Sequence, residues 1–524
     1  MRIKKILPVM VTSIVTSLFT SGCNISRIVT DAQIDEYYNK ATGEIVIPED
    51  KDVYIDFWTW GSTTTEAIYT NVAKKFEAKY PNIHIKYTCT PSSTYLTKLA
   101  NSSNDLPDCF FVPDTDFYYY AFNQIIWNFR DYVTNAEVDS VWDDCMARYF
   151  YDKNTKTVGK TDDAGLYAIP KDLSVFQMAY NETLLKAACK ELLQQTGDAK
   201  YEWNTIKTRY LNDKSPMNWN EFRELGALIN PYCRNHDKYF LSHYELYAAL
   251  YSNNADFTTD DGSASRVEEP QFAAALDFLH SLGFGEGGSN KTGLMAGSSG
   301  TSTSAGYTSF VGQNSIFSWV GPWDCETFWG VTPVKPTAID FTIKVLPCPY
   351  GPGADGAYGT SDDGVSSCQI GSAGYCISGK STTTNLQRAA SLKFLKWMSM
   401  TEECQRDLYQ SGSMFPTLKS LKDEYIEFGE GQITQYAGGK VDVNPSNLYV
   451  FIDSVDGCSA TDRVSGRAKT QTRTLGNEWK DDWSNAVDKA NFWTNPNCKG
   501  ADVVKIYKST LDDWLSQYNS RLGR

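Results

Sequence analysis

A short strand that runs into two tryptophans constrains this chain more than any other stretch. Residues 53–57 alternate between apolar and polar side chains with the two-residue period of a β-strand, and Trp58, Trp60 and Gly61 follow. In an open α/β sheet, ligands bind beyond the carboxyl ends of the strands. We therefore expect both tryptophans at a ligand site. Burial in the core is the alternative, because tryptophan is mostly buried in proteins.

The residues that follow continue this alternation of strand and helix. Residues 63–80 carry apolar side chains at fourfold spacing, which predicts a helix. Residues 83–87 alternate as a second strand, residues 95–100 are helical, and residues 109–112 form a continuous apolar run typical of a buried strand. Strands that alternate with helices predict a lobe built on a parallel sheet.

The beginning of the chain has the pattern of an export signal. Basic residues precede an apolar run, residues 6–19, that is too short to span a membrane. Residues 20–23 place small side chains directly before a cysteine and resemble the lipobox of bacterial lipoproteins. This resemblance implies that residues 1–22 are a signal peptide and that Cys23 is lipidated. The polar residues up to Asp50 are expected to be a tether, residues 23–50.

Size and charge limit the class of protein further. A chain of 524 residues is too long for one compact core, so we expect two lobes. The net charge of −14 becomes −17 when the three positive charges of residues 1–22 are removed, which argues against nucleic acid as a partner. Most of the other twelve cysteines lie in apolar or helical patterns, where cysteine behaves as a small hydrophobic residue. Disulfides remain the alternative, but no CxxC pair indicates a metal cluster.

Several sequence blocks, in one fixed order, resemble the extracellular sugar-binding proteins of ATP-binding cassette importers, the group that includes maltose-binding protein. The similarity covers roughly residues 51–419. Its blocks are residues 76–83, 95–99, 106–110, 167–172, 179–182, 218–222, 310–316, 321–324, 345–347, 389–398, 401–405 and 415–417. Each block alone is a weak signal, and their common order is a strong one.

The resemblance implies an α/β fold of the two-lobed periplasmic-binding-protein class II, with an interlobe hinge and a ligand cleft. The first lobe is expected to comprise residues 51–173 and 345–410, and the second lobe residues 174–344 and 411–524, with crossings near Ser174, Leu346 and Ser411. A carbohydrate would close the hinge, and the closed monomer would deliver it to membrane permease subunits. The lipid on Cys23 would hold the protein on the outer face of the cytoplasmic membrane or in the periplasm. No cofactor is implied.

A sugar site needs flat aromatic side chains beside carboxylates, because sugars present apolar ring faces and hydroxyl edges. The expected ligand contacts are Trp58, Trp60, Asp114 and Asp116 from the first lobe and Tyr244, Glu245, Trp323 and Asp324 from the second lobe. Trp323 matches the Gly-Pro-Trp tryptophan of the family, which is commonly a stacking platform. Trp319 is expected in the core, and Lys171 with Asp172 at the hinge.

Two other motifs are weighed and rejected. Residues 374–381 match the phosphate-binding loop pattern, but the intervening residues favour a strand. Residues 351–356 match a dinucleotide fingerprint, but an Asp- and Gly-rich loop follows instead of a helix. The carboxylates of this loop, Asp355, Asp362 and Asp363, lack EF-hand spacing, so a turn is favoured over a calcium site.

The sequence shows no catalytic or metal-binding signature. It contains no Gly-x-Ser-x-Gly motif and no HExxH pair. A pair of carboxylates across a cleft, as in glycoside hydrolases, is not visible in a sequence. A surface carbohydrate-active enzyme and a sugar-sensing module without transport therefore stay as alternatives to the importer receptor. The aromatic content favours an oligosaccharide, and other polyols remain possible ligands.

Overall fold

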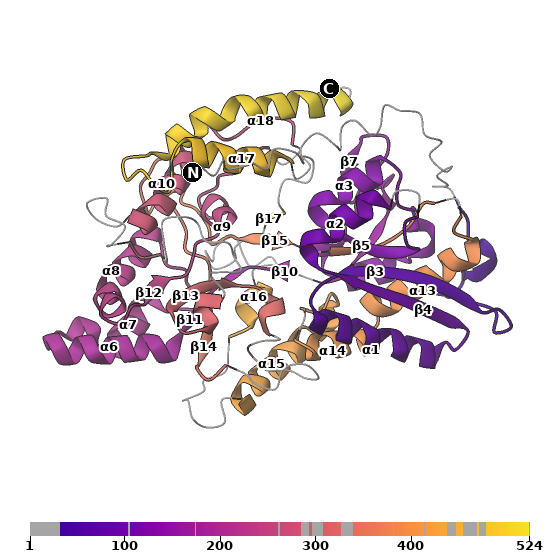
Figure 1. Ribbon diagram of the computed structural model, residues 1–524, viewed down its shortest axis with the longest axis horizontal. Coiled ribbons are helices and arrows are strands. Elements are labelled where there is room, and N and C mark those ends of the chain that lie inside the picture. Colours follow the sequence, from indigo (N-terminus) through magenta and orange to yellow (C-terminus); the bar gives the residue numbers. More distant parts are fainter. Residues whose placement is uncertain are drawn as a thin grey trace, which may run out of the picture.

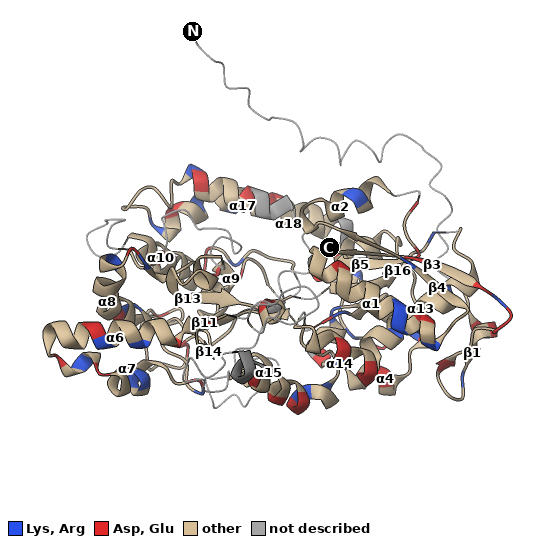
Figure 2. Ribbon diagram, turned by 60° about the horizontal axis from the view of Figure 1, so that its bottom comes forward, with Lys and Arg blue, Asp and Glu red and all other residues tan. Residues whose placement is uncertain are grey.

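The computed structural model describes residues 32–522, apart from residues 103–104, 173, 260–261, 285–292, 296–307, 326–327, 329–338, 372, 381, 413, 437–446, 454–468 and 471–477. Two α/β lobes lie side by side and are joined by short strands between them (Figure 1). The predicted two-lobed α/β fold is therefore confirmed. Asp and Glu residues are spread over both lobes (Figure 2).

The first lobe is built on a five-stranded sheet in the order β4-β3-β5-β16-β9. Its strands are β3 (Val53–Trp60), β4 (Ile83–Thr90), β5 (Cys109–Pro113), β9 (Ala168–Pro170) and β16 (Ala373–Ile377), and β16 runs antiparallel to its two neighbours. On β3, Val53, Ile55 and Phe57 are buried while the alternate side chains are more exposed, as the two-residue period predicts.

Helices cover both faces of this sheet (Figure 1). They are α1 (Thr63–Lys79) and α13 (Asn385–Met400) on one face, and α2 (Ser92–Asn101) and α3 (Asp114–Phe122) on the other. Phe57 packs edge-on against Phe394 of α13, with ring centroids 5.3 Å apart. Trp60 points to the opposite face, where its ring lies 5.3 Å from Tyr95 of α2.

The second lobe has a four-stranded sheet in the order β12-β13-β11-β14. These strands are β11 (Gln177–Asn181), β12 (Tyr239–Leu241), β13 (Ser315–Val320) and β14 (Ile343–Leu346). Its helices include α6 (Glu182–Thr196), α7 (Trp203–Tyr210), α8 (Trp219–Asn235), α9 (Leu246–Tyr251), α10 (Pro270–Phe284), α17 (Glu478–Lys489) and α18 (Gly500–Leu522). A capping box between Asn218 and Glu221 starts α8.

The first two crossings between the lobes run through short strands. Strand β10 (Ser174–Val175) pairs with β15 (Gln369–Gly371), which in turn pairs with β17 (Lys469–Thr470). The first crossing therefore lies at Ser174. The second crossing was expected near Leu346, but Leu346 lies opposite Met178 inside the sheet of the second lobe. The chain returns only between β15 and β16, because residues 343–364 remain bound to the second lobe, partly through Asn253 and Asn254.

The third crossing also comes later than expected. Beyond Ser411, Thr417 still belongs to the first lobe, since its hydroxyl donates to the carbonyl of Ser399 at 2.6 Å. Helix α14 (Glu402–Gln410) precedes this point, and α15 (Lys422–Tyr436) leads across to α16 (Tyr449–Asp453) beside β14.

The predicted tether is wrong for its described part, residues 32–50. Ile34 and Ile45 are buried, and the indole of Trp127 donates to the carbonyl of Ala32 at 3.0 Å. Lys393 of α13 donates to the carbonyl of Ile45 at 2.6 Å. Residues 32–47 therefore pack on the first lobe through a few apolar side chains that lack a regular period. The signal peptide and Cys23 lie outside the described residues.

The cysteines of the described residues are free thiols, and all of them except Cys89 are buried. This agrees with their interpretation as small hydrophobic residues. Within the same described residues, no helix has the length and apolar character that a membrane span requires.

Candidate ligand-binding site

The carboxyl ends of β3 and β5 bring the first-lobe candidates to one edge of the sheet. Trp60 is half-buried and packs edge-on against Phe111, with centroids 5.1 Å apart. Trp58 is also half-buried, but the ammonium of Lys98 lies 3.9 Å from the centroid of its ring. A cation–π contact thus occupies one face of Trp58. Trp60 is therefore the better aromatic platform of the two.

Asp114 and Asp116 lie in the first turn of α3, directly after β5. The carboxylate of Asp114 lies 2.6 Å from the guanidinium of Arg148, and Asp114 is only 9% exposed. Burial opposes the charge of Arg148, yet Asp114 and nearby side chains hold the pKa of Arg148 above its ordinary value. This ion pair makes Asp114 part of the framework, and Asp116 is the more exposed of the two candidates.

In the second lobe, Trp323 is the most accessible candidate. It lies in the 3-10 helix η6 (Pro322–Asp324), which directly follows β13, and it is 37% exposed. Its ring packs edge-on against Phe176, at 4.9 Å, in the short segment between β10 and β11. Trp323 is therefore held at the hinge. Asp324 instead caps its own turn, because its carboxylate accepts the N–H of Gly321 at 2.8 Å.

Tyr244 and Glu245 have different environments. Tyr244 is 8% exposed, and its ring packs against Phe278 and Trp319, at 5.1 Å from each. Burial raises the pKa of Tyr244 well above its ordinary value. The structure thus places the Tyr244 ring in the core of the second lobe and not at a ligand surface. Trp319 lies in the same core, as predicted.

Glu245 is held by a chain of hydrogen bonds that starts in the sheet. Ser242 donates to the hydroxyl of Ser318 on β13 at 2.8 Å, and its oxygen lies 3.0 Å from His243 Nδ1. The other ring nitrogen, Nε2, lies 3.1 Å from Glu245 Oε1. His243 was not predicted as a site residue, because nothing in the local sequence marks it. It fixes the position of the carboxylate next to the hinge-side end of β12.

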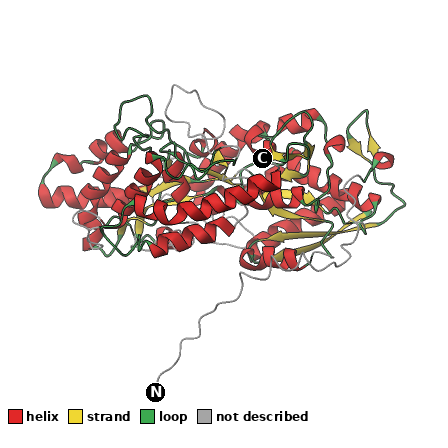
Figure 3. Ribbon diagram, turned by 90° about the horizontal axis from the view of Figure 1, so that it is seen from above, coloured by secondary structure: helices red, strands yellow, loops and turns green. Residues whose placement is uncertain are grey.

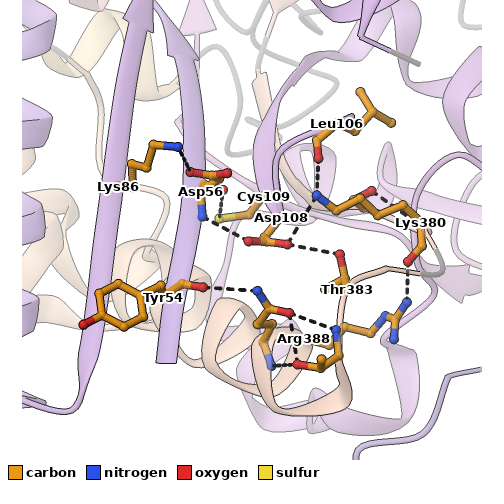
Figure 4. Close-up of polar contacts among 12 residues, drawn as sticks. Tyr54, Asp56, Lys86, Leu106, Asp108, Cys109, Lys380, Thr383 and Arg388 are labelled. Carbon is orange, nitrogen blue, oxygen red and sulfur yellow. Dashed lines mark hydrogen bonds and ion pairs between the residues drawn. The ribbon is translucent and has the colours of Figure 1, made fainter. Parts of the chain in front are cut away.

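The segment that matches a phosphate-binding loop has a structural role. Residues 373–377 form β16, and Lys380 donates to the carbonyl of Leu106 and lies 3.6 Å from the carboxylate of Asp108 (Figure 4). Asp108 also accepts the hydroxyl of Thr383 at 3.0 Å. This cluster lies at the amino end of β5, whereas Asp114 follows the carboxyl end. Lys380 therefore ties β16 to β5.

The Asp-rich loop between Gly351 and Gly364 is a hydrogen-bonded turn. Asp362 accepts the N–H of Asp355 at 2.9 Å and the hydroxyl of Thr360 at 2.7 Å. These two donors, Thr360 first, lower the pKa of Asp362. Asp363 accepts the N–H of Gly359. The carboxylates thus stabilise the loop itself.

A cavity of about 290 Å³ lies apart from the candidate residues, between α8, α10 and this loop. Trp219, Arg223, Asp277, Phe278 and Tyr358 are among the residues that line it. Trp219 and Phe278 stack face to face at 4.2 Å, so their ring faces cover each other. The cavity contains none of the predicted ligand contacts.

Two α/β lobes joined by a hinge, with aromatic and acidic side chains at the strand ends next to it, define the class of hinged substrate-binding proteins. The chain belongs to the family of bacterial extracellular solute-binding proteins, whose family model matches residues 71–437. The resemblance seen in the sequence is therefore confirmed. No curated protein sequence matches the chain significantly.

Solved structures with the same fold cover most of the chain. A substrate-binding protein from Listeria monocytogenes in complex with cycloalternan is 15% identical, covers 90% of this chain and 100% of its own, and has a TM-score of 0.59. Maltose-bound MalE3 of T. maritima is 16% identical over 88% of this chain and 99% of its own, with a TM-score of 0.59. UgpB from Mycobacterium tuberculosis in complex with glycerophosphocholine is 15% identical, covers 90% of this chain and 99% of its own, and has a TM-score of 0.58. At these identities the likeness establishes the fold alone.

Proposed function

We propose that this protein is a lipid-anchored receptor that captures a carbohydrate, preferably an oligosaccharide, by hinge closure and delivers it to an ATP-binding cassette importer. The observation that carries this proposal is Trp323, a large aromatic side chain that stays 37% exposed at the hinge end of the second lobe. A ligand that covers this ring removes apolar surface from water, which favours binding. The apolar face of a sugar ring is suited to do so.

The remaining contacts follow from the residues around it. Trp60 offers a second platform from the first lobe, and Asp116 and Glu245 offer carboxylates that accept sugar hydroxyls. A ligand that touches both lobes binds the closed form more tightly, so it shifts the hinge toward closure. Two of the structural neighbours hold cycloalternan and maltose, and a third holds glycerophosphocholine. Ligands with several oxygen atoms thus occupy this fold.

The cellular location and the partners of the protein belong to the same proposal. Lipidation of Cys23 would hold the monomer at the outer face of the cytoplasmic membrane or in the periplasm, next to the permease subunits. A single acyl chain binds a membrane only reversibly, so stable anchoring needs more than one chain. A surface enzyme and a sensing module are the competing functions.

Calorimetric titration of residues 24–524 with maltose and cycloalternan tests the proposal. We expect saturable binding near micromolar, about −8 kcal/mol, that weakens at least about tenfold in Trp323→Ala. Tyr239→Ala is the matched control, because Tyr239 is 42% exposed at the opposite end of β12. Binding that survives Trp323→Ala would contradict this site, and recovery of cleaved sugar would favour the enzyme.

A further inference from the structure

Helix α18 is firmly attached to the second lobe. The N–H of Gly500, at its start, donates to Asp277 of α10 at 2.8 Å. Tyr507 packs edge-on against Trp483 of α17, with ring centroids 5.1 Å apart, and the indole of Trp514 donates to Asp482 at 2.9 Å. Leu511 and Leu515 are buried on the same side. The first four turns of α18 therefore move with the second lobe.

The last turns of α18 reach the first lobe. Figures 1 and 3 show the helix running from the second lobe across to the first. There the ring of Tyr518 meets the ring of Tyr118 edge-on, with centroids 6.0 Å apart, and Tyr518 is buried. Tyr118 in turn packs against Tyr151 of β6 (Phe150–Asp152). Burial, and then the proximity of Tyr518, raises the pKa of Tyr151 to about 12.

The position of Tyr118 links this contact to the ligand site. Tyr118 lies one turn after Asp114 and two residues after Asp116 in α3, the helix that begins at the edge of the candidate site. No covalent crossing passes through the Tyr118–Tyr518 contact. A rotation of the lobes about the β10–β15 hinge shifts α3 relative to α18 and therefore disturbs the packing of these two rings.

We propose that α18 is an interlobe strap, in which the contact between Tyr518 and Tyr118 holds the lobes at the present spacing, with Trp323 exposed, and opposes closure. The Tyr118–Tyr518 contact contributes the packing of one aromatic ring pair to the strap. Such a pair changes the ratio of two states about 2- to 10-fold. The strap sets how readily the hinge closes before any ligand arrives, and it does not depend on the ligand being a carbohydrate.

Single-molecule energy transfer on the ligand-free mature chain tests the strap. Dyes are attached through an azido amino acid at Tyr54 in the first lobe and at Lys190 in the second lobe, both of which are exposed. In Tyr518→Ala we expect the population of shorter interlobe distances to rise about 2- to 10-fold. Tyr518→Phe keeps the ring and should match the unmodified chain, as should Gln517→Ala at the exposed neighbouring position.

A second variant separates loss of the strap from loss of folding. Tyr118→Ala removes the other ring of the pair. The double variant Tyr118→Ala/Tyr518→Ala should populate the closed form no more than Tyr518→Ala does, because either change alone already removes the contact. An unchanged distance distribution in Tyr518→Ala, or a shift to longer distances, would overturn the strap. This measurement uses no ligand, so its result remains valid even if the proposed carbohydrate function is wrong.

Discussion

The carboxylate of Asp114 lies 2.6 Å from the guanidinium of Arg148, and both side chains are almost completely buried. Asp114 starts α3 and Arg148 lies 34 residues further along the chain, so the pair fixes the first turn of α3 against the segment that leads into β6. The turn that carries Asp116 is thereby positioned by a buried ion pair.

Arg148→Met should lower the free energy of unfolding by about 3–5 kcal/mol, because it leaves the charge of Asp114 buried without its main partner. Urea denaturation measures this loss. The double variant Arg148→Met/Asp114→Leu should recover most of it, since an apolar pair removes both buried charges. A double variant that is less stable than Arg148→Met would show that Asp114 has a further essential partner.

Glu245→Gln should weaken binding of the carbohydrate identified by titration about 10- to 100-fold, because a hydrogen bond to a charged group contributes about 1.5–3 kcal/mol. His243→Gln should weaken it less, since the carboxylate remains but loses the contact at 3.1 Å that orients it. Calorimetry measures both. Glu202→Gln, at an exposed position of the same lobe, is the control. Unchanged affinity in Glu245→Gln would mean that this carboxylate serves only His243.

The first lobe was predictable because its signals are local. The two-residue period of Val53 to Phe57 and the helix that follows need no distant partner. The strand ends at Trp60, at the carboxyl edge of the sheet, as predicted. Tyr244 was misplaced because its burial depends on Phe278 and Trp319, which come later in the chain. No spacing in the sequence reveals which side of a short loop will face them.

Long-range partners explain the other differences. Arg148 has no local pattern that pairs it with Asp114, and residues 32–47 bind to α13, which lies about 350 residues away. The second crossing was placed too early because Val345 and Leu346 are equally suited to a crossing segment and to a central strand. Their pairing with Ala179 and Met178 decides between the two.

Lys380→Met should lower the free energy of unfolding by about 1–3 kcal/mol, because Asp108 then loses a charged partner at a buried position. Thermal denaturation measures the effect, with Lys190→Met at an exposed position as the control. Addition of ATP should leave the melting temperature of the unmodified chain unchanged. A rise that Lys380→Met abolishes would restore the phosphate-loop interpretation.

The carboxylate of Asp152 should stabilise the folded chain only when it is ionised, at pH values above its pKa. Burial alone would raise its pKa, but the backbone N–H groups of Asn154 and Thr155 outweigh burial and lower the pKa of Asp152. Asn154 donates to it at 2.7 Å. Because the folded-state pKa lies below the unfolded value of about 3.9, the folded chain binds fewer protons at this group. Its stabilisation is complete above that value and is lost as the pH falls through the lowered pKa.

Asp152→Asn should therefore flatten the fall in stability between pH 5 and about pH 3, while at pH 7 it lowers the free energy of unfolding. Urea denaturation across this range measures the slope. Asp162→Asn removes the same charge from an exposed position nearby and controls for net charge. If both variants change the slope equally, the effect comes from overall charge and not from the N–H groups that bind Asp152. If only Asp152→Asn flattens it, the turn after β6 is one of the places where acid unfolds this lobe.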